Sequence, residues 1–317
     1  MTVGIADVEA ARDRVGPRVE RTPLVSSGAL GLRTGCHAWL KLESMQHSGS
    51  FKVRGALNAL ALLTPAQRAA GVVTMSAGNA ALAVAYAARA AGVTATVVMP
   101  EHASSMKIAA TRAYGAEIRF GAAVTELLPI VRALEAEGRH LVHPFDDEGM
   151  IAGHGTAALE VLEDLPEADL FVVPVGGGGL ISGIATVVAA RRPGARVVGV
   201  EPIGAQGMRR ALDAGRVVTL DAIDTIADGL APPFAGANTL GIVQRLVSDV
   251  VAIPDTAIRE GMRFLFERAR VVAEASGAAA VAALLTGAVV PRSGERVVAI
   301  VSGGNVDLDR YRELLAP

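Results

Sequence analysis

The sequence predicts an α/β protein with two lobes, built from mostly parallel sheets that helices cover. Short apolar segments rich in Val and Ile alternate with Ala-rich segments of helical length along most of the 317 residues. The strand-like segments carry few charges, which is typical of strands that are buried on both faces. Small glycine-containing turns follow several of these strands and lead directly into the next helix.

The N-terminal part is less regular than the rest. Residues 5–15 have the apolar spacing of an amphipathic helix, and residues 36–43 alternate like a strand. The segment 21–27 contains a proline and small polar residues, so we expect an extended or loop conformation there. Residues 53–70 have helical spacing that a Thr-Pro step interrupts.

Residues 71–147 have the clearest β-then-α rhythm and predict a small lobe with its own parallel sheet. Glycine closes two of the expected helices. The expected strands are 71–76, 94–100, 116–120 and 140–144, and the expected helices are 79–92, 104–115 and 124–138, the last with Pro129 inside it.

The rhythm resumes beyond this lobe and predicts a larger lobe that combines 1–70 with 148–317. The expected helices are 155–165, 180–192, 258–271 and 277–287. The expected strands are the first part of 170–179, the whole of 196–202 and the first part of 295–305.

Composition and charge exclude several classes of function. The net charge is −2, so no basic surplus indicates a nucleic-acid partner. No run approaches the ~18–20 apolar residues of a membrane span, and the N-terminus has no apolar signal core. The single cysteine, Cys36, cannot form an internal disulfide, and a small buried side chain is a more ordinary role for it than a reactive thiol. We expect a cytoplasmic protein with no membrane or nucleic-acid partner.

A run of four glycines is the most informative local motif. The segment PVGGGGLISG, 174–183, joins an apolar strand to a helix. Glycine lets the backbone approach a ligand closely, and the free N–H groups of a helix N-terminus favour an anion. The spacing matches neither the Walker pattern nor GxGxxG. We predict that this loop binds a phosphate group.

Two further loops also follow strands. In VSGGN, 301–305, Ser302 would lie at the carboxyl edge of the sheet, where α/β proteins bind ligands, although a plain turn is the simpler interpretation. In MSAGN, 75–79, the N–H groups could bind a carboxylate. Asn79 could touch a ligand there, but its local sequence favours a helix cap.

Lys52 lies between Phe51 and Arg54 in HSGSFKVRGA, and could be a solvated charge, an ion-pair partner or a reactive amine. A phosphate site, a carboxylate site and a lysine together indicate pyridoxal 5'-phosphate acting on an amino acid. That cofactor binds a lysine amine through its aldehyde, and its phosphate needs N–H donors. Burial beside an aromatic ring would lower the lysine pKa and favour this reaction. Arg54 is expected to be structural.

Six motifs occur in a family-like order: SFKVRGA, SAGN, PVGGGGL, GVEP, ADGLA and SGGN. In this order and spacing the chain resembles the fold-type-II pyridoxal phosphate enzymes, whose two-lobed fold is that of the tryptophan synthase β subunit. Within them it is most similar to the threonine/serine dehydratase and serine racemase group. The resemblance covers nearly the whole chain, from residue 21 to residue 309.

The resemblance implies roles for individual residues. Lys52 would be the catalytic lysine bonded to the cofactor, and the substrate carboxylate would bind at the SAGN loop. The other implied cofactor contacts are Phe51, Asn79, Gly176, Gly177, Gly178, Gly179 and Ser302. The implied substrate contacts are Ser76, Ala77, Gly78, Asn79 and Arg132. Arg132 falls where the racemase group has a carboxylate-binding arginine, and a surface ion pair is an equal alternative for it.

The implied activity is dehydration of a β-hydroxy L-amino acid, threonine, serine or a bulkier analogue, to a 2-oxo acid and ammonia. Ser302 is neutral and would favour prompt β-elimination over transamination. The racemase pattern has a second serine where this chain has Ala77, so little racemisation is expected. The alternatives are a β-replacement synthase related to cysteine synthase, a racemase-like enzyme, and a non-catalytic phosphate-binding module.

Departures from the family pattern refine these expectations. Ala80 and Leu82 replace polar residues, and the loop 232–238 is apolar, which suggests a substrate larger or more apolar than serine. The racemase metal site would use Glu201, but its second acidic position is Gly207, so no metal is predicted. The family also implies a homodimer. We interpret His140 and His143, near Asp146 and Asp147, as ordinary polar residues rather than a metal site.

Overall fold

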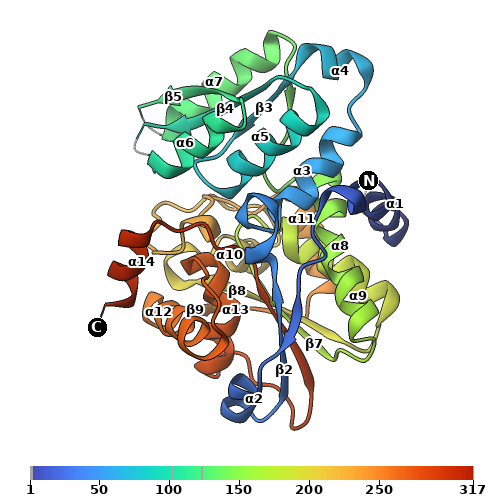
Figure 1. The fold of residues 1–317 in the computed structure, drawn as a ribbon, viewed down its shortest axis with the longest axis vertical. Helices are drawn as coiled ribbons and strands as arrows, with labels where there is room; N and C mark the ends of the chain where they lie inside the picture. Colours follow the sequence, from blue (N-terminus) through green and yellow to red (C-terminus); the bar gives the residue numbers. More distant parts are fainter. Residues whose placement is uncertain (1–2, 102, 104, 123, 317) are drawn as a thin grey trace.

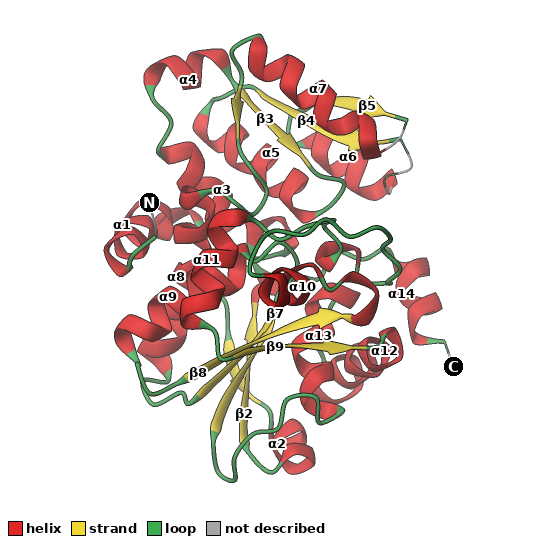
Figure 2. Cartoon of the chain, turned by 180° about the vertical axis from the view of Figure 1, so that it is seen from behind, coloured by secondary structure: helices red, strands yellow, loops and turns green. Residues whose placement is uncertain are grey.

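The computed structural model describes residues 3–101, 103, 105–122 and 124–316, and its chain forms two lobes, each with its own sheet (Figure 1). This confirms the predicted mixed α/β fold with parallel sheets. Figure 2 shows the two sheets as separate groups of strands with helices between and around them. Residue 104, at the start of one expected helix, lies outside the described residues.

The larger sheet has six strands in the order β1-β2-β10-β7-β8-β9. All neighbours in it are parallel except β1, which is antiparallel to β2. Val298 of β10 lies opposite Trp39 of β2 and Phe171 of β7, which fixes the register at the centre. The strands are β1 Leu24–Ser26, β2 His37–Leu42, β7 Leu170–Pro174, β8 Arg196–Pro202, β9 Asp249–Ile253 and β10 Arg296–Val301.

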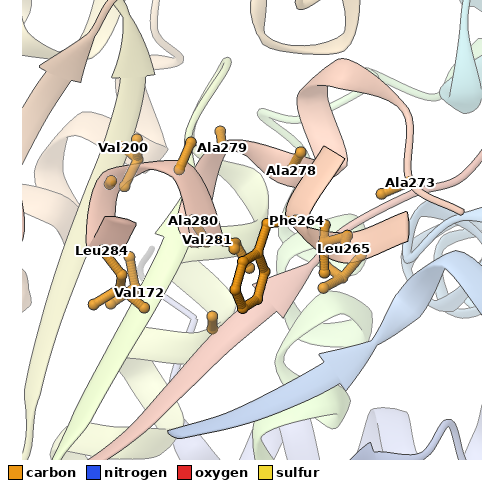
Figure 3. Close-up of a cluster of buried hydrophobic side chains, with 14 of the residues drawn as sticks. Val172, Val200, Phe264, Leu265, Ala273, Ala278, Ala279, Ala280, Val281 and Leu284 are labelled. Atoms are coloured by element: carbon orange, nitrogen blue, oxygen red, sulfur yellow. The ribbon is translucent and has the colours of Figure 1, made fainter. Parts of the chain in front are cut away.

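An Ala-rich helix covers one face of this sheet. Helix α13, Ala275–Leu285, is buried over nearly its whole length, and its small side chains let it lie close to Val172 of β7 and Val200 of β8 (Figure 3). Because aromatic residues are only 3% of the chain, close approach of backbones replaces large side chains as the means of filling this core. The remaining helices on this face are α2 Gly28–Thr34, α12 Asp255–Phe264 and α14 Leu308–Leu315, with a π-helical turn at Leu265–Ala269, whereas α10 Gly207–Ala214 packs with the core of the opposite face.

The opposite face of the larger sheet is covered by a second group of helices. Phe171 and Val173 of β7 point to this group, whereas Val172 between them points to α13, as the period of a strand requires. Both faces are therefore buried, in agreement with the low charge of these strands. The helices of this layer are α1 Ile5–Val15, α8 Glu148–Asp164, α9 Gly179–Arg191 and α11 Ala237–Leu246.

The smaller sheet is entirely parallel, in the order β5-β4-β3-β6. All of its strands lie inside the segment 71–147 that the sequence predicts as the small lobe. Val97 of β4 packs on one face and Val98 on the other. Its strands and helices are β3 Val72–Met75, β4 Ala95–Pro100, β5 Glu117–Gly121, β6 His140–Leu141, α5 Asn79–Ala91, α6 Ser105–Ala113 and α7 Val124–Ala136.

Helix α3, Lys52–Ala61, lies at the junction of the lobes, and α4, Pro65–Ala70, follows it after a Thr64 cap (Figures 1 and 2). The side chains of α3 share a core with β3 and β4 of the small lobe, and the other side of α3 lies against α8. The helix that begins with Lys52 is thus in contact with both lobes.

The sequence missed several elements. Strand β1 lies in the segment 21–27, where an extended or loop conformation is expected, and α2, α10, α11, α14 and β9 have no predicted counterpart. Helix α8 begins at Glu148, seven residues before the expected 155, because Asp147 caps it with a bond from Met150 N (2.8 Å). No helix among the described residues is both long and apolar enough to cross a membrane.

Candidate active site

Lys52 is the first residue of α3, and its amine is held at the junction of the lobes. The Nζ atom donates to the carbonyl oxygen of Pro144 at 2.6 Å and lies 5.2 Å from the centroid of the Phe51 ring. Burial lowers the pKa of Lys52 from its ordinary value of 10.5 to about 8, since the ammonium form loses hydration. The side chain has no acidic partner among its described contacts and its amine is not solvated, which argues against the ion-pair and solvated-charge alternatives.

The glycine run forms the turn between β7 and α9. Gly178 has φ of +94°, a left-handed conformation, and a Cβ atom there would lie 2.6 Å from Met208 Cε. The carbonyl of Gly177 accepts from Thr239 Oγ1 (2.7 Å) and Gly236 N (3.2 Å). In a trans peptide the next N–H points the opposite way. The N–H of Gly178 therefore points away from Thr239 and Gly236, and it precedes the first N–H groups of α9, which have no acceptor within the helix and suit an anion.

Helix α8 separates the lysine helix from the glycine-loop helix, and glycines bring all three close together. A Cβ atom on Gly153 would lie 2.4 Å from the Arg54 carbonyl oxygen of α3. A Cβ atom on Gly183 of α9 would lie 2.4 Å from the Ile151 carbonyl oxygen of α8. Both contacts are possible only for glycine, so they fix the distance between Lys52 and the glycine loop.

His154 lies at this helix crossing. Its ring packs edge-on against Phe51, with centroids 4.7 Å apart, and its nitrogens interact only weakly with the main chain of Gly179 and Lys52. Burial, and then the positive charge of Lys52, hold the pKa of His154 well below its ordinary value of 6.5. His154 is therefore a neutral packing group at neutral pH.

The SGGN loop follows β10 and pairs with the segment before Lys52. Phe51 N donates to the Ser302 carbonyl oxygen at 3.1 Å, and Ser50 forms an antiparallel bridge with Gly303. Ser302 is 4% exposed. These main-chain bonds place Ser302 beside the lysine although 250 residues separate the two in the chain (302 − 52).

The SAGN loop lies between β3 and α5. Gly78 N donates to Ser76 Oγ at 3.1 Å, which shapes the turn, and residues 76–79 are only partly buried. The interpretation of Asn79 as a helix cap is wrong, because Gly78 is the N-cap residue and makes no side-chain cap. Instead, Asn79 Nδ2 donates to Glu274 Oε1 (2.5 Å), and Asn79 Oδ1 accepts from Asn305 Nδ2 (2.9 Å).

Glu274 is a site residue that sequence reasoning missed. It is an acidic residue, 4% exposed, directly before the apolar helix α13. The available signal was a lone acidic residue in the segment AEASGAAAV, where a charge has no solvated neighbours in the sequence. Its partner, Asn79, is 195 residues away, so only the fold shows the contact.

The structure brings Lys52, the glycine loop, Asn79 and Ser302 together, and it places Arg132 differently. The Arg132 guanidinium is 67% exposed and pairs with Glu135, three residues on, at 2.9 Å. This contact is the surface ion pair of the second alternative.

The candidate metal residues have ordinary partners. Glu201 accepts from Met208 N (2.7 Å) and Arg209 N (2.9 Å), so its carboxylate caps α10. His143 Nδ1 accepts from Asp146 N at 3.0 Å, and His140 Nδ1 lies 3.0 Å from Gln67 Nε2. Within the described part of the chain, no group of three or more acidic, His or Cys side chains could hold a metal ion.

The residues present fit pyridoxal phosphate. A partly buried amine with a pKa of about 8 suits an aldehyde, and the start of α9 suits a phosphate. Ser302 would give a bound pyridine nitrogen a neutral partner, and Asn79 keeps one amide N–H that would be available to the ring hydroxyl.

The fold and this lysine–glycine arrangement define a pyridoxal phosphate enzyme of the fold-type-II class. The family model described as "Pyridoxal-phosphate dependent enzyme" matches residues 15–303, and the chain belongs to this family. The catabolic L-threonine dehydratase of Escherichia coli K12 is 39% identical over 99% of this chain and 96% of its own length.

Two solved structures are similar over nearly the whole chain. Maize serine racemase has a TM-score of 0.94 and 38% identity, over 99% of this chain and 97% of that one. The threonine deaminase of T.th. has a TM-score of 0.90 and 40% identity, over 96% and 99% of the two chains.

Proposed function

We propose that this protein is a pyridoxal phosphate-dependent dehydratase, an ammonia-lyase that acts on a β-hydroxy L-amino acid such as threonine or serine. It releases a 2-oxo acid and ammonia. The observation that carries the proposal is the Lys52 amine, held by the Pro144 carbonyl at 2.6 Å in the same site as the glycine loop. The full-length similarity to threonine dehydratases supports it.

Each group of residues has a defined task. The bound cofactor supplies the electron sink for breaking the substrate Cα–H bond. The neutral Nζ of Lys52 takes the Cα proton and passes it to the β-hydroxyl, which leaves as water while the Cα electron pair forms the Cα–Cβ double bond. The resulting enamine tautomerises and is hydrolysed to the 2-oxo acid and ammonia.

The other assigned residues bind and orient. The N–H groups of Gly176–Gly179 bind the cofactor phosphate, and Asn79 donates to the ring oxygen. Ser302 faces the pyridine nitrogen without an opposite charge. The loop 76–78 binds the substrate carboxylate; Arg132, exposed and paired with Glu135, is not needed for that contact.

Ala77 lies in the carboxylate loop and has no exchangeable proton. A racemase needs a second acid/base on the face of the substrate opposite the lysine. Dehydration without substantial racemisation follows from this.

Apolar residues near the glycine loop favour a substrate more apolar than serine. A Cβ atom on Gly177 would lie only 2.2 Å from the nearest atoms of the Phe145 ring. Phe234 packs on Phe145, with ring centroids 6.0 Å apart. Both aromatic rings are partly exposed. An apolar β-substituent buried there gains about 0.8 kcal/mol per methylene.

The purified, cofactor-loaded protein is expected to release 2-oxo acid from L-threonine, with a kcat/KM above that for L-serine. The measurement couples oxo acid to a reductase and follows phenylserine in parallel. Chiral analysis of residual serine reports racemisation, and added sulfide reports β-replacement. An Arg132→Ala variant serves as a surface control and should keep wild-type kinetics.

Each other outcome contradicts one part of the proposal. D-serine formed as fast as oxo acid would show a racemase, and a new amino acid formed with sulfide would show a replacement synthase. Serine turnover equal to that of threonine and phenylserine would remove the apolar-substrate preference.

A homodimer and a cytoplasmic location complete the proposal. Phe266 (48% exposed) and Leu308 (72% exposed) line an apolar groove of about 570 Å³ beside α14. Such a patch on a surface is typical of an interaction site. Sedimentation equilibrium should give twice the chain mass of 32.4 kDa, and Leu308→Glu should shift the mass toward the monomer. A wild-type monomer would contradict this assembly.

A further inference from the structure

Glu274 contacts both the SGGN loop and the start of α5 after the SAGN loop, and the proposed function does not use it. Its main-chain N–H donates to the Gly303 carbonyl oxygen at 3.1 Å, which joins it to the SGGN loop. It precedes α13 but makes no side-chain cap for that helix. The carboxylate is therefore free to act elsewhere, and it points to Asn79.

The contact between Glu274 and Asn79 depends on a glycine. Glu274 Oε1 accepts from Asn79 Nδ2 at 2.5 Å, and a Cβ atom on Gly303 would lie 2.4 Å from the same carboxylate oxygen. The same Cβ atom would lie 3.2 Å from Asn79 Nδ2. Only a residue without a side chain at 303 leaves room for the hydrogen bond.

Asn79 is held from both ends of its carboxamide. Its oxygen accepts from Asn305 Nδ2 at 2.9 Å, and Asn305 also donates to the Ser48 carbonyl at 2.7 Å. Flipping the amide would turn its oxygen toward the Glu274 carboxylate and its NH₂ toward the Asn305 NH₂. Two acceptors and two donors would then oppose one another, so a single orientation is stable.

We propose that Glu274 is a positioning residue, which holds Asn79 so that its second amide N–H faces the 3-oxygen of the cofactor ring. This inference rests on the cofactor contact assigned to Asn79 in the proposed function. In this proposal Glu274 acts on the cofactor through Asn79.

Burial of the Glu274 carboxylate lowers the stability of the fold. A positioning role and a purely structural role for Glu274 therefore predict different effects of its replacement on stability. Burial raises the pKa of Glu274 from 4.5 to about 7, and the nearby Lys107, paired with Asp228 at 2.8 Å, lowers it only in part. Above about pH 7 the unfolded chain holds the same carboxylate in water at no cost. A neutral replacement should therefore preserve or raise stability while it weakens cofactor binding.

The test compares Glu274→Gln with Glu201→Gln. Glu201 is a matched control because it is equally buried, accepts two main-chain N–H bonds and has a pKa raised by burial to about 7. Glu274→Gln should raise the dissociation constant for pyridoxal phosphate about tenfold, because the charge-assisted hydrogen bond that orients Asn79 becomes a neutral one. It should also move the visible absorption band of the bound cofactor, without lowering Tm at pH 8. Glu201→Gln should leave affinity and band unchanged.

A double-mutant cycle identifies the route of the effect. In an Asn79→Ala background, Glu274→Gln should change cofactor affinity no further. An equal loss in both backgrounds, or wild-type affinity and absorption for Glu274→Gln, would overturn the proposal. Should Glu274→Gln fail to fold, Asn305→Ala tests the same orientation from the amide oxygen and should weaken cofactor binding. Cofactor affinity is measured without substrate, so the outcome is independent of which amino acid the enzyme consumes.

Discussion

Replacing Lys52 by arginine is expected to lower kcat/KM for 2-oxo acid release by at least ~10³-fold, because the residue supplies both the bond to the cofactor and the general base. Arginine keeps the positive charge but stays protonated, so it neither attacks an aldehyde nor accepts a proton. The measurement is steady-state turnover of L-threonine at saturating cofactor. Turnover within tenfold of the wild type would remove Lys52 from the reaction.

The chain contains only three lysines, so the bonded residue can be identified without ambiguity. Borohydride reduction of the loaded protein followed by peptide mapping should find the cofactor on Lys52. Lys41 is fully buried and paired with Glu160 at 2.5 Å, and Lys107 is paired with Asp228, so neither amine is free. These two lysines are internal controls, and label on either would contradict the assignment.

The same lysine predicts how cofactor uptake depends on pH. The ammonium form cannot attack an aldehyde, and burial lowers the pKa of Lys52 to about 8. The rate at which the cofactor-free protein takes up pyridoxal phosphate should therefore rise with pH and reach half its maximum near 8. A midpoint near 10.5, the ordinary value, would show a solvated amine.

Replacing Arg54 by alanine is expected to lower the free energy of unfolding by about 3–5 kcal/mol, since it leaves the buried Glu43 carboxylate without its ion-pair partner and Glu160 with Lys41 alone. Arg54 is fully buried and donates to Glu43 at 2.8 Å and to Glu160 at 2.7 Å. Burial alone would raise the pKa of Glu43, but the guanidinium outweighs it and holds that pKa below its usual value. Urea unfolding of the two proteins measures the difference.

Arg21 provides a matched control for this change. It also bridges two acidic residues, Glu163 and Asp164, both at 2.6 Å, but its side chain is 49% exposed. Because water screens that pair, Arg21→Ala should cost no more than about 1 kcal/mol. Equal losses for the two variants would show that the buried cluster contributes no more than a surface ion pair.

The sequence by itself determined the α/β class and most of the strands and helices, because their signals are local. Apolar runs such as 196–202 became strand β8 with the expected bounds, and the Ala-rich pattern at 79–92 became α5. It also indicated the cofactor, since the glycine run, the lysine and the ordered motifs are readable in one dimension. Weak local signals such as the three-residue β1 were missed, because only pairing with β2 makes that segment a strand.

Only the tertiary structure decided which polar residues meet. Lys52 acquires its lowered pKa from burial at the junction of two lobes, and Asn79 finds Glu274 across that junction instead of capping its own helix. Arg54 is structural, as its neighbourhood suggested, but its partners Glu43 and Glu160 come from other elements. The burial of a side chain and its pairing with a distant residue depend on how the helices and strands pack. Shifted pKa values and ion-pair energies depend on that burial and pairing, so only the folded chain determines them.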